Sequence, residues 1–229
     1  MSKRIHYHLI LWISLSFTSQ LFAQSYDIWY TYPHTNNSKI RENRKFGMLD
    51  SNNQVILTPI YDEVNDFYNG LARVVKDGKL GFVNKQAVAV IPFDYDPDTL
   101  LMTGQKLFIT QHNDGSKEIK IGTDERRQSF QEGLLCVIKN GKYGFIDQYN
   151  KVVIPFQFDG GDNFYEGMAI VKQKDKFGVI DKQGAITIPF QFDLLVWLFE
   201  FNPVLFVQNN GECYLMNTSQ QKTGTCQDL

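Results

Sequence analysis

Apolar residues in this chain occur in short alternating runs separated by turn sequences. The segments VVKDGKLGFV, VIKNGKYGFI and FVQNNGECYLM each place Asp-Gly or Asn-Gly between runs rich in Val, Ile, Phe and Tyr. Both central residues of a type I′ turn need positive φ, so this pattern is a strong local signal of a β-hairpin. The segment ITQHNDGSKEIKI carries the same signal. No segment after residue 23 keeps a helical apolar stripe, so we expect an all-β chain.

A second break returns each hairpin into a third apolar run. The sequences NKQ, DQYN and DKQG lead into VAVIP, VVIP and AITIP. Each unit therefore reads as a three-stranded meander, whose proline ends the third strand or lies at a sheet edge, where a missing N–H does no harm. We expect tandem meanders in an open curved array or a closed, propeller-like ring, since closure removes sheet edges. Half-units at the two ends could complete one sheet between them.

The units repeat at a fixed spacing. The same 34-residue period separates Gly47 from Gly81 and Gly144 from Gly178. Each glycine is followed by Asp or Asn three residues later, and then, at a second constant spacing, by an aromatic residue and Asp. The four aspartates at this last position are Asp62, Asp96, Asp159 and Asp193. A period of this length predicts a repeat architecture.

One gap breaks the period, because Gly81 and Gly144 are separated by slightly less than two periods. Residues 97–128 contain strand-like runs but no IPF segment, and either an eroded repeat or a 29-residue insertion explains them. The predicted organisation is a signal peptide, an N-terminal segment with a half-repeat, a repeat domain and a polar tail, at residues 1–23, 24–44, 45–217 and 218–229.

The recurring motifs resemble those of the WG repeat proteins, also called KWG repeats. The motifs are K-F-G-M-L-D, K-L-G-F-V-N, K-Y-G-F-I-D and K-F-G-V-I-D, followed by V-I-P-F-x-[FY]-D and F-x-x-G-[LM]-A. The resemblance covers about residues 45–193, with a terminal half-unit at 207–217. Smaller side chains replace the tryptophan that names the family, at Phe46, Leu80, Tyr143 and Phe177. The resemblance implies binding mediated by the repeats, and it supplies no catalytic residues.

The recurring glycines and aspartates have structural and functional interpretations. A glycine in mid-strand is expected where a neighbouring backbone or ring approaches closely. The rings beside it are expected in the core, although a ligand-stacking platform is the alternative. One carboxylate per repeat is best explained by a turn in which Asp accepts backbone N–H bonds.

Composition and the first residues point to an exported protein. Lys3 and Arg4 precede the apolar run LILWISLSFTSQLF, and Ala23 offers a small residue for cleavage, so residues 1–23 read as a signal peptide. We expect a periplasmic, cell-surface or secreted protein, most simply in a bacterium, with no integral membrane domain after cleavage. The net charge of −2 and the absence of a long basic run argue against nucleic acid.

Few residues suggest chemistry. Only His34 and His112 follow the signal, and no nucleophile, zinc or phosphate-loop motif is present, so we expect no enzyme, cofactor or metal site. Asp94, Asp96 and Asp98 resemble the start of a calcium loop but lack its glycine and its bidentate Glu.

The three cysteines lead to one prediction. Cys213, in the last hairpin, and Cys226, in the polar tail that follows it, are close enough along the chain to form a disulfide. Cys136 within LLCVI is expected to be a buried thiol.

The expected function is binding of another macromolecule, most simply a protein. Loops on a rigid scaffold usually carry binding, so the variable second turns are the candidate surface. Their residues are Gln148, Tyr149, Lys182 and Gln183. The alternative is a carbohydrate-binding module that uses exposed aromatic rings, with Trp29, Tyr30, Tyr32, Phe93 and Tyr165 as its candidates.

Overall fold

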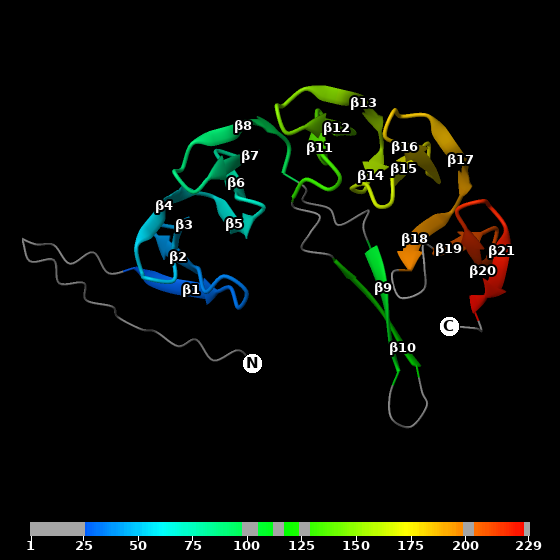
Figure 1. The fold of residues 1–229 in the computed structure, drawn as a ribbon, viewed down its shortest axis with the longest axis horizontal. Coiled ribbons are helices and arrows are strands. Elements are labelled where there is room, and N and C mark those ends of the chain that lie inside the picture. The colour runs from blue at the N-terminus through cyan, green and yellow to red at the C-terminus, as the bar shows by residue number, and fades with distance from the viewer. Residues whose placement is uncertain (1–25, 98–104, 112–116, 124–128, 199–203, 227–229) are drawn as a thin grey trace, which may run out of the picture. The chain divides into compact units, whose positions relative to one another are not determined.

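The computed structural model describes residues 26–97, 105–111, 117–123, 129–198 and 204–226 (Figure 1). All regular structure in these ranges is antiparallel β-sheet, and no α-helix occurs among them. The chain divides into two compact units, 1–94 and 95–229, each of which is described by itself. The signal-peptide region, His112, Asp98 and the Asp114–Gly115 turn lie outside the described residues.

The first unit contains two four-stranded meanders. The strands of the first are β1 (Asp27–Thr31), β2 (Ser38–Glu42), β3 (Lys45–Leu49) and β4 (Val55–Tyr61). The strands of the second are β5 (Glu63–Tyr68), β6 (Leu71–Lys76), β7 (Lys79–Asn84) and β8 (Ala89–Tyr95), whose last residue begins the second unit.

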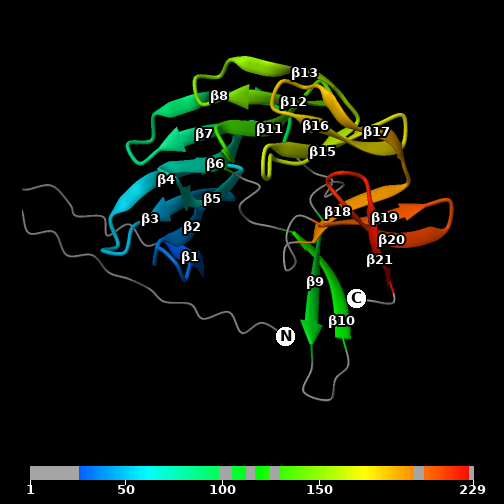
Figure 2. The ribbon, with the colours of Figure 1, turned by 45° about the vertical axis from the view of Figure 1, so that its right-hand side comes forward.

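The second unit contains three further meanders and one separate hairpin (Figure 2). The hairpin pairs β9 (Gln105–Gln111) with β10 (Lys117–Thr123). The first meander is β11 (Leu134–Lys139), β12 (Lys142–Asp147) and β13 (Val152–Phe158). The second is β14 (Gly160–Gly161), β15 (Met168–Gln173), β16 (Lys176–Asp181) and β17 (Ile186–Phe192). The third is β18 (Leu194–Leu198), β19 (Val204–Asn209), β20 (Glu212–Asn217) and β21 (Lys222–Thr225).

The predicted tandem meander is confirmed, and four of the five meander sheets have a further strand before the predicted three. In the sheets of β5 and β14 that strand follows the recurring aspartate, where apolar alternation is weak. Strand β5 pairs with a register shift between Val64 and Phe67, and β14 has only two residues.

The two terminal sheets correct the expected boundaries. Strands β1 to β4 complete the first sheet from residues 27–61, and β18 to β21 complete the last from residues 194–225. The N-terminal half-repeat and the C-terminal half-unit are therefore full sheets, and neither shares a sheet with the other end. Residues 222–225, expected in a polar tail, form β21 because they pair with β20.

The hairpin turns adopt the backbone conformation that their residues predict. Asp77-Gly78, Asn140-Gly141 and Asn210-Gly211 all have positive φ, between 51° and 79°. Lys174-Asp175 and Asn43-Arg44 also have positive φ although they contain no glycine. Five hairpins therefore share one turn geometry.

Each core lies between successive sheets because side chains alternate along a strand. In the second unit, Phe145 and Ile154 of one sheet pack against Ala169, Val171 and Ile180 of the next. The opposite face of that next sheet, which includes Val179 and Ile188, packs against Leu205 and Met216 of the last sheet. Both faces of an interior sheet are thus buried.

Hydrogen bonds around Asp96 explain the gap in the period. Asp62 donates its N–H to the carbonyl of Val75 and accepts from the Gly78 N–H in the hairpin turn of the next sheet. Asp96 makes the same two bonds, to Ile138 and Gly141, although these partners lie much further along the chain. Both bonds of Asp96 span 29 residues more of the sequence than the corresponding bonds of Asp62, which is the length of the predicted insertion. Residues 97–128 therefore behave as an insertion between equivalent positions rather than as an eroded repeat.

Within the described ranges, no helix has the length and hydropathy needed to cross a membrane.

Candidate functional site

The second turn of every meander is built by one side chain at the end of the middle strand. The Oδ1 atom of Asp147 accepts the N–H groups of Tyr149 and Lys151, both at 2.9 Å. Asp50, Asn84 and Asp181 accept equivalent pairs, and Asn217 accepts from Gln221. Such Asx turns fix the loop backbone without using the outward-facing side chains. The loop residues are therefore free to differ between repeats.

The recurring glycines provide space for the third strand. A Cβ at Gly144 would lie 2.8 Å from Phe156 Cδ1 and 2.9 Å from the Ile154 carbonyl oxygen. Gly81 and Gly178 meet a ring and a carbonyl in the same way, and Gly47 meets only backbone. The predicted close approach of a backbone or a ring to these glycines is confirmed. The neighbouring Tyr143 and Phe177 are buried in the cores, not on a ligand platform.

The recurring aspartates join successive repeats. The Asp159 carboxylate accepts from Lys142 Nζ of its own sheet at 2.5 Å, and from the Lys174 N–H in the hairpin turn of the next sheet at 2.8 Å. Asp62 and Asp193 make the corresponding pairs. We call this arrangement the aspartate clamp. The sequence predicted backbone N–H donors for these carboxylates, but not that the donors belong to the following repeat.

The clamp also lowers the pKa of its carboxyl groups. The lysine hydrogen bond is the largest cause at Asp62, Asp159 and Asp193, and the backbone N–H of the next hairpin adds to it. Both donors favour the carboxylate over the protonated acid. At neutral pH all three side chains act as fixed anions that hold structure, which is different from a carboxyl group poised for proton transfer.

The four turn residues proposed for binding have different environments. Gln148 and Gln183 are exposed, and the Tyr149 side chain is 80% exposed. Lys182 is half-buried: its Nζ pairs with Glu132 Oε2 at 2.9 Å and donates to the Glu132 carbonyl. Lys182 thus links two repeats, whereas the other three present their side chains to solvent.

Exposed apolar side chains gather beside these turns. Most of the large apolar side chains that are exposed in the described chain lie on a second turn or on the last strand of a sheet. In the second unit they are Tyr149, Val152, Val153 and Ile186, which we call the outer rim surface. The next turn packs on this strand, since a Cβ at Gly184 would be 3.5 Å from Ile154 Cγ2. In the first unit, Val55, Ile60, Val88 and Val90 are likewise exposed on a second turn or a last strand.

The last strands are poorly suited to pair with a further strand. Each of β4, β8, β13 and β17 contains a proline, and β4, β13 and β17 pair with their neighbours through register shifts. Proline and bulges are the devices by which natural sheets prevent edge-to-edge addition. Contacts to this surface would therefore use side chains more than backbone hydrogen bonds.

The proposed glycan-binding rings divide into two groups. Trp29 and Tyr30 are each 50% exposed on β1. The Arg41 guanidinium lies 5.0 Å from the Trp29 ring centroid, and Phe46 meets Trp29 edge-on. By contrast, Tyr32, Phe93 and Tyr165 pack partly buried against the cores.

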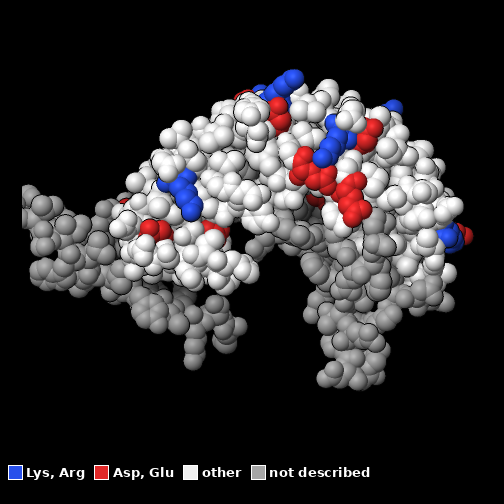
Figure 3. All heavy atoms as spheres, in the orientation of Figure 1, with Lys and Arg blue, Asp and Glu red and all other residues white. Residues whose placement is uncertain are grey.

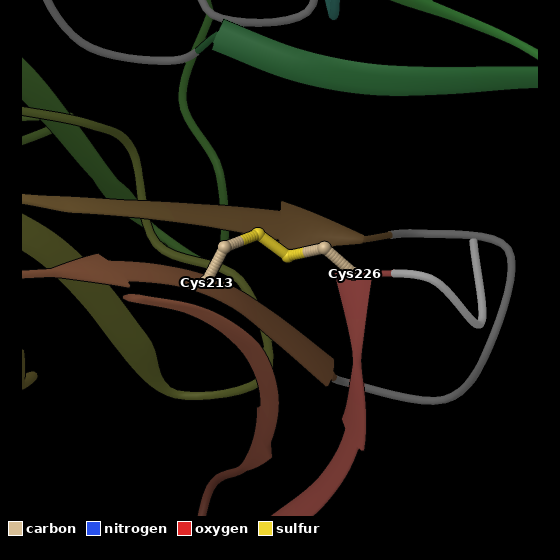
Figure 4. The surroundings of a disulfide bond; sticks show 2 residues. All are labelled: Cys213 and Cys226. Atoms are coloured by element: carbon tan, nitrogen blue, oxygen red, sulfur yellow. A yellow bond between two sulfur atoms is a disulfide. The ribbon is translucent and has the colours of Figure 1, made fainter. Parts of the chain in front are cut away.

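The structure joins Cys213 and Cys226 in a disulfide with Cα atoms 5.7 Å apart (Figure 4). Cys136 keeps its thiol and is half-buried, less than predicted: it packs at the margin of the core that contains Leu134 and Phe145, with its Sγ close to Gly161.

Charge and metal-binding groups are sparse in the described chain. On the face shown in Figure 3, basic and acidic side chains lie in small mixed groups. No cluster of three or more His, Cys, Asp or Glu among the described residues could hold a metal ion. Asp96 instead accepts the Gly141 N–H, which is its clamp position.

Three solved structures show weak likenesses to this chain. Kluyveromyces lactis Hsv2 matches at 10% identity and a TM-score of 0.31, over 80% of this chain and 71% of that one. A eukaryotic initiation factor matches at 9% and 0.32, over 82% and 62%. A plant lectin with two metal-binding sites from Cicer arietinum matches at 12% and 0.21, over 65% and 83%. TM-scores this low support no assignment.

Sequence comparison gives the family. The search of curated proteins gave no match. The family described as WG containing repeat matches residues 46–79, 143–177 and 177–213. These segments contain the crowded glycines at Gly47, Gly144 and Gly178, and they belong to sheets with the same meander and the same Asx turn. The chain belongs to the family of WG-containing repeat proteins.

Proposed function

We propose that this protein is an exported, non-enzymatic scaffold that binds another protein through the outer rim surface. The main support for this proposal is the position of the exposed apolar side chains. Tyr149 is exposed on a second turn, Val152 and Val153 on β13, and Ile186 on β17 of the next sheet, and Asx turns and aspartate clamps hold the backbone there. Exposed apolar groups on a rigid frame are typical of an interaction site, because their burial drives association.

The partner proposed here is a protein with a complementary apolar patch. Proline and bulges in β13 and β17 disfavour strand addition, so side-chain burial would supply the affinity. Tyrosine is enriched where binding energy concentrates, because its ring buries a large area with few rotatable bonds. Tyr149, at 80% exposed, is the residue expected to matter most.

The test is photo-crosslinking from position 149 in the native cell envelope, followed by identification of the captured partner and binding with purified components. The variants Tyr149→Ser and Ile186→Ser should each weaken that binding at least about tenfold, which corresponds to 1.4 kcal/mol. The matched control is Tyr68→Ser, an exposed tyrosine on β5. Equal binding by all three variants would reject the outer rim surface.

A second candidate is glycan binding at Trp29 and Tyr30. The supporting observation is a half-exposed indole with Arg41 over its ring, an arrangement that offers a stacking face beside a hydrogen-bond donor. Retention on polysaccharide that is lost in Trp29→Ala and kept in Tyr149→Ser would favour this function over the first.

A further inference from the structure

The last sheet carries apolar side chains on both faces. Leu195 and Trp197 of β18, with Leu205 and Val207 of β19, pack toward the preceding sheet. The alternate residues form a separate cluster on the other face. That cluster consists of the buried Val196 and Leu198, with Leu194, Val204, Phe206 and Leu215 packed against them.

This second face is buried without a following sheet. In the preceding repeats, the corresponding face is covered by the next meander, as Val179 and Ile188 are by the last sheet. No sheet follows β21 in the described chain. Even so, Val196 and Leu198 are only 4% and 2% exposed. Another part of the chain must therefore cover them.

The inserted hairpin lies at this position. Strand β9 contacts β18 in the same unit, and both ribbon views draw the upper end of β9 beside β18 (Figures 1 and 2). The hairpin belongs to no meander, and its two strands pair only with each other in the described residues. Hydrogen bonds at Asp96 show that the segment lies between two positions that are equivalent in the other repeats.

We propose that the β9–β10 hairpin is the cap of the last sheet: it docks on the face of Val196, Leu198 and Phe206 and replaces the missing next repeat. Arrays of stacked repeats need such caps, because their terminal units otherwise present a core face to water. The insertion thus lies in the middle of the sequence but acts at the C-terminal end of the array.

The test compares one substitution in two backgrounds. The shortened chain lacks residues 100–128, which restores the 34-residue spacing between Gly81 and Gly144. Val196→Thr keeps the side-chain shape but adds a hydroxyl, which is costly only where water is excluded. The matched control is Val207→Thr, on the opposite face of the same sheet and fully buried.

In the full chain, both substitutions should lower Tm by several degrees. In the shortened chain, Val207→Thr should still do so, Val196→Thr should have little effect, and binding of an apolar dye should rise. A shortened chain that dimerises until Val196→Thr is introduced would equally show that the deletion uncovers this face. An equal loss of Tm for Val196→Thr in both backgrounds, in a monomer, would overturn the proposal.

A second variant avoids the deletion. Ile109→Pro in the full chain places a proline in the middle of β9, where Ile109 lies opposite Ile119, and proline disfavours strand structure there. It should raise dye binding and reduce the effect of Val196→Thr while leaving that of Val207→Thr unchanged. Unchanged dye binding and an unchanged Val196→Thr effect would also contradict the cap.

Discussion

The interior sheet of β14–β17 and the last sheet of β18–β21 share one meander but stabilise it differently. In the interior sheet, Phe177 pairs with Phe192 across the strands, and Gly178 leaves room for the Phe190 ring. In the last sheet, Cys213 occupies the position of Phe177 and is bonded to Cys226, while Tyr214 occupies the position of the glycine. Gly224 now lies opposite Leu215, on the third strand.

The difference shows which repeat positions depend on a neighbour. The glycine is required where the backbone of the third strand, in most repeats together with a ring, lies close over it. At the corresponding place in the last sheet, Lys222 of β21 extends over Tyr214, 4.5 Å from its ring centroid. The Phe177–Phe192 pair of the interior sheet is replaced in the last sheet by the Cys213–Cys226 disulfide, which holds the short edge strand β21. The recurring glycine and aromatic residues are therefore required by close packing and by contacts between repeats more than by the meander itself.

The disulfide should give the largest effect. Reduction, or Cys226→Ser, should lower the free energy of unfolding of the second unit by about 3 kcal/mol, the chain-entropy value for a loop of this length. Thermal unfolding with and without reductant measures it. Cys136→Ser is the control, because its thiol is outside the bridge and its response to reductant should match that of the wild type. A reductant-insensitive wild type would show that packing alone holds β21.

Gly178→Ala should be next in size. The added Cβ would lie 2.8 Å from the Ile188 carbonyl oxygen and 2.9 Å from Phe190 Cδ1, and the backbone atom cannot move aside cheaply. Overpacking of this kind costs about 1–3 kcal/mol, to be measured by urea unfolding. Gly224→Ala is a matched substitution in the last sheet. If Gly178→Ala is neutral, crowding is not the reason for the glycine.

Acid should weaken the junctions between successive sheets, including the junction that Asp193 makes with the last sheet. The folded-state pKa of Asp62, Asp159 and Asp193 lies below the usual 3.8, so between the two values the unfolded chain binds more protons. The clamps therefore stabilise fully above about pH 4, and this stability is lost as pH falls through the lowered pKa. Unfolding free energies between about pH 6 and pH 2 measure it. A variant with all three residues changed to Asn should show a flatter profile.

A single clamp should matter little at neutral pH. Asp159→Asn loses the ion pair with Lys142 and keeps an oxygen that accepts the Lys174 N–H. Partly exposed pairs of this kind contribute less than about 1 kcal/mol. The expected decrease should shrink further in high salt, and a salt-independent loss would point to hydrogen-bond geometry instead.

The smallest effect on folding is expected at the outer rim surface. Tyr149→Ser should leave Tm within about one degree of the wild type, since the side chain is 80% exposed and the Asp147 turn uses only backbone donors. A large drop in Tm would show that Tyr149 packs in the scaffold, and it would remove the basis for assigning it to binding.

The meander, its turns and the crowded glycines follow from the sequence because each depends on residues close together in the chain. Asp77-Gly78 specifies a hairpin by itself, and Asp147 captures N–H groups two and four residues later. The periodic glycine indicated a close approach, although not which strand supplied it.

Features that depend on the next repeat could not be read in the same way. The clamp of Asp159 reaches a backbone N–H 15 residues away in another sheet, and no local pattern marks that donor. Lys182 looked like a variable surface residue, yet its partner Glu132 is 50 residues earlier. Strand β14 was missed because a two-residue strand of glycines has no apolar alternation to detect.

The aspartate clamp also bears on how such a chain can lengthen by duplication. Each repeat contributes the carboxylate at its end and the hairpin N–H at its start, so one copy already contains both halves of a junction. A duplicated repeat would therefore join its parent through bonds that both copies encode, without any compensating substitution. The extra segment at residues 97–128 shows the same tolerance, because Asp96 makes across it the same two backbone bonds that Asp62 makes.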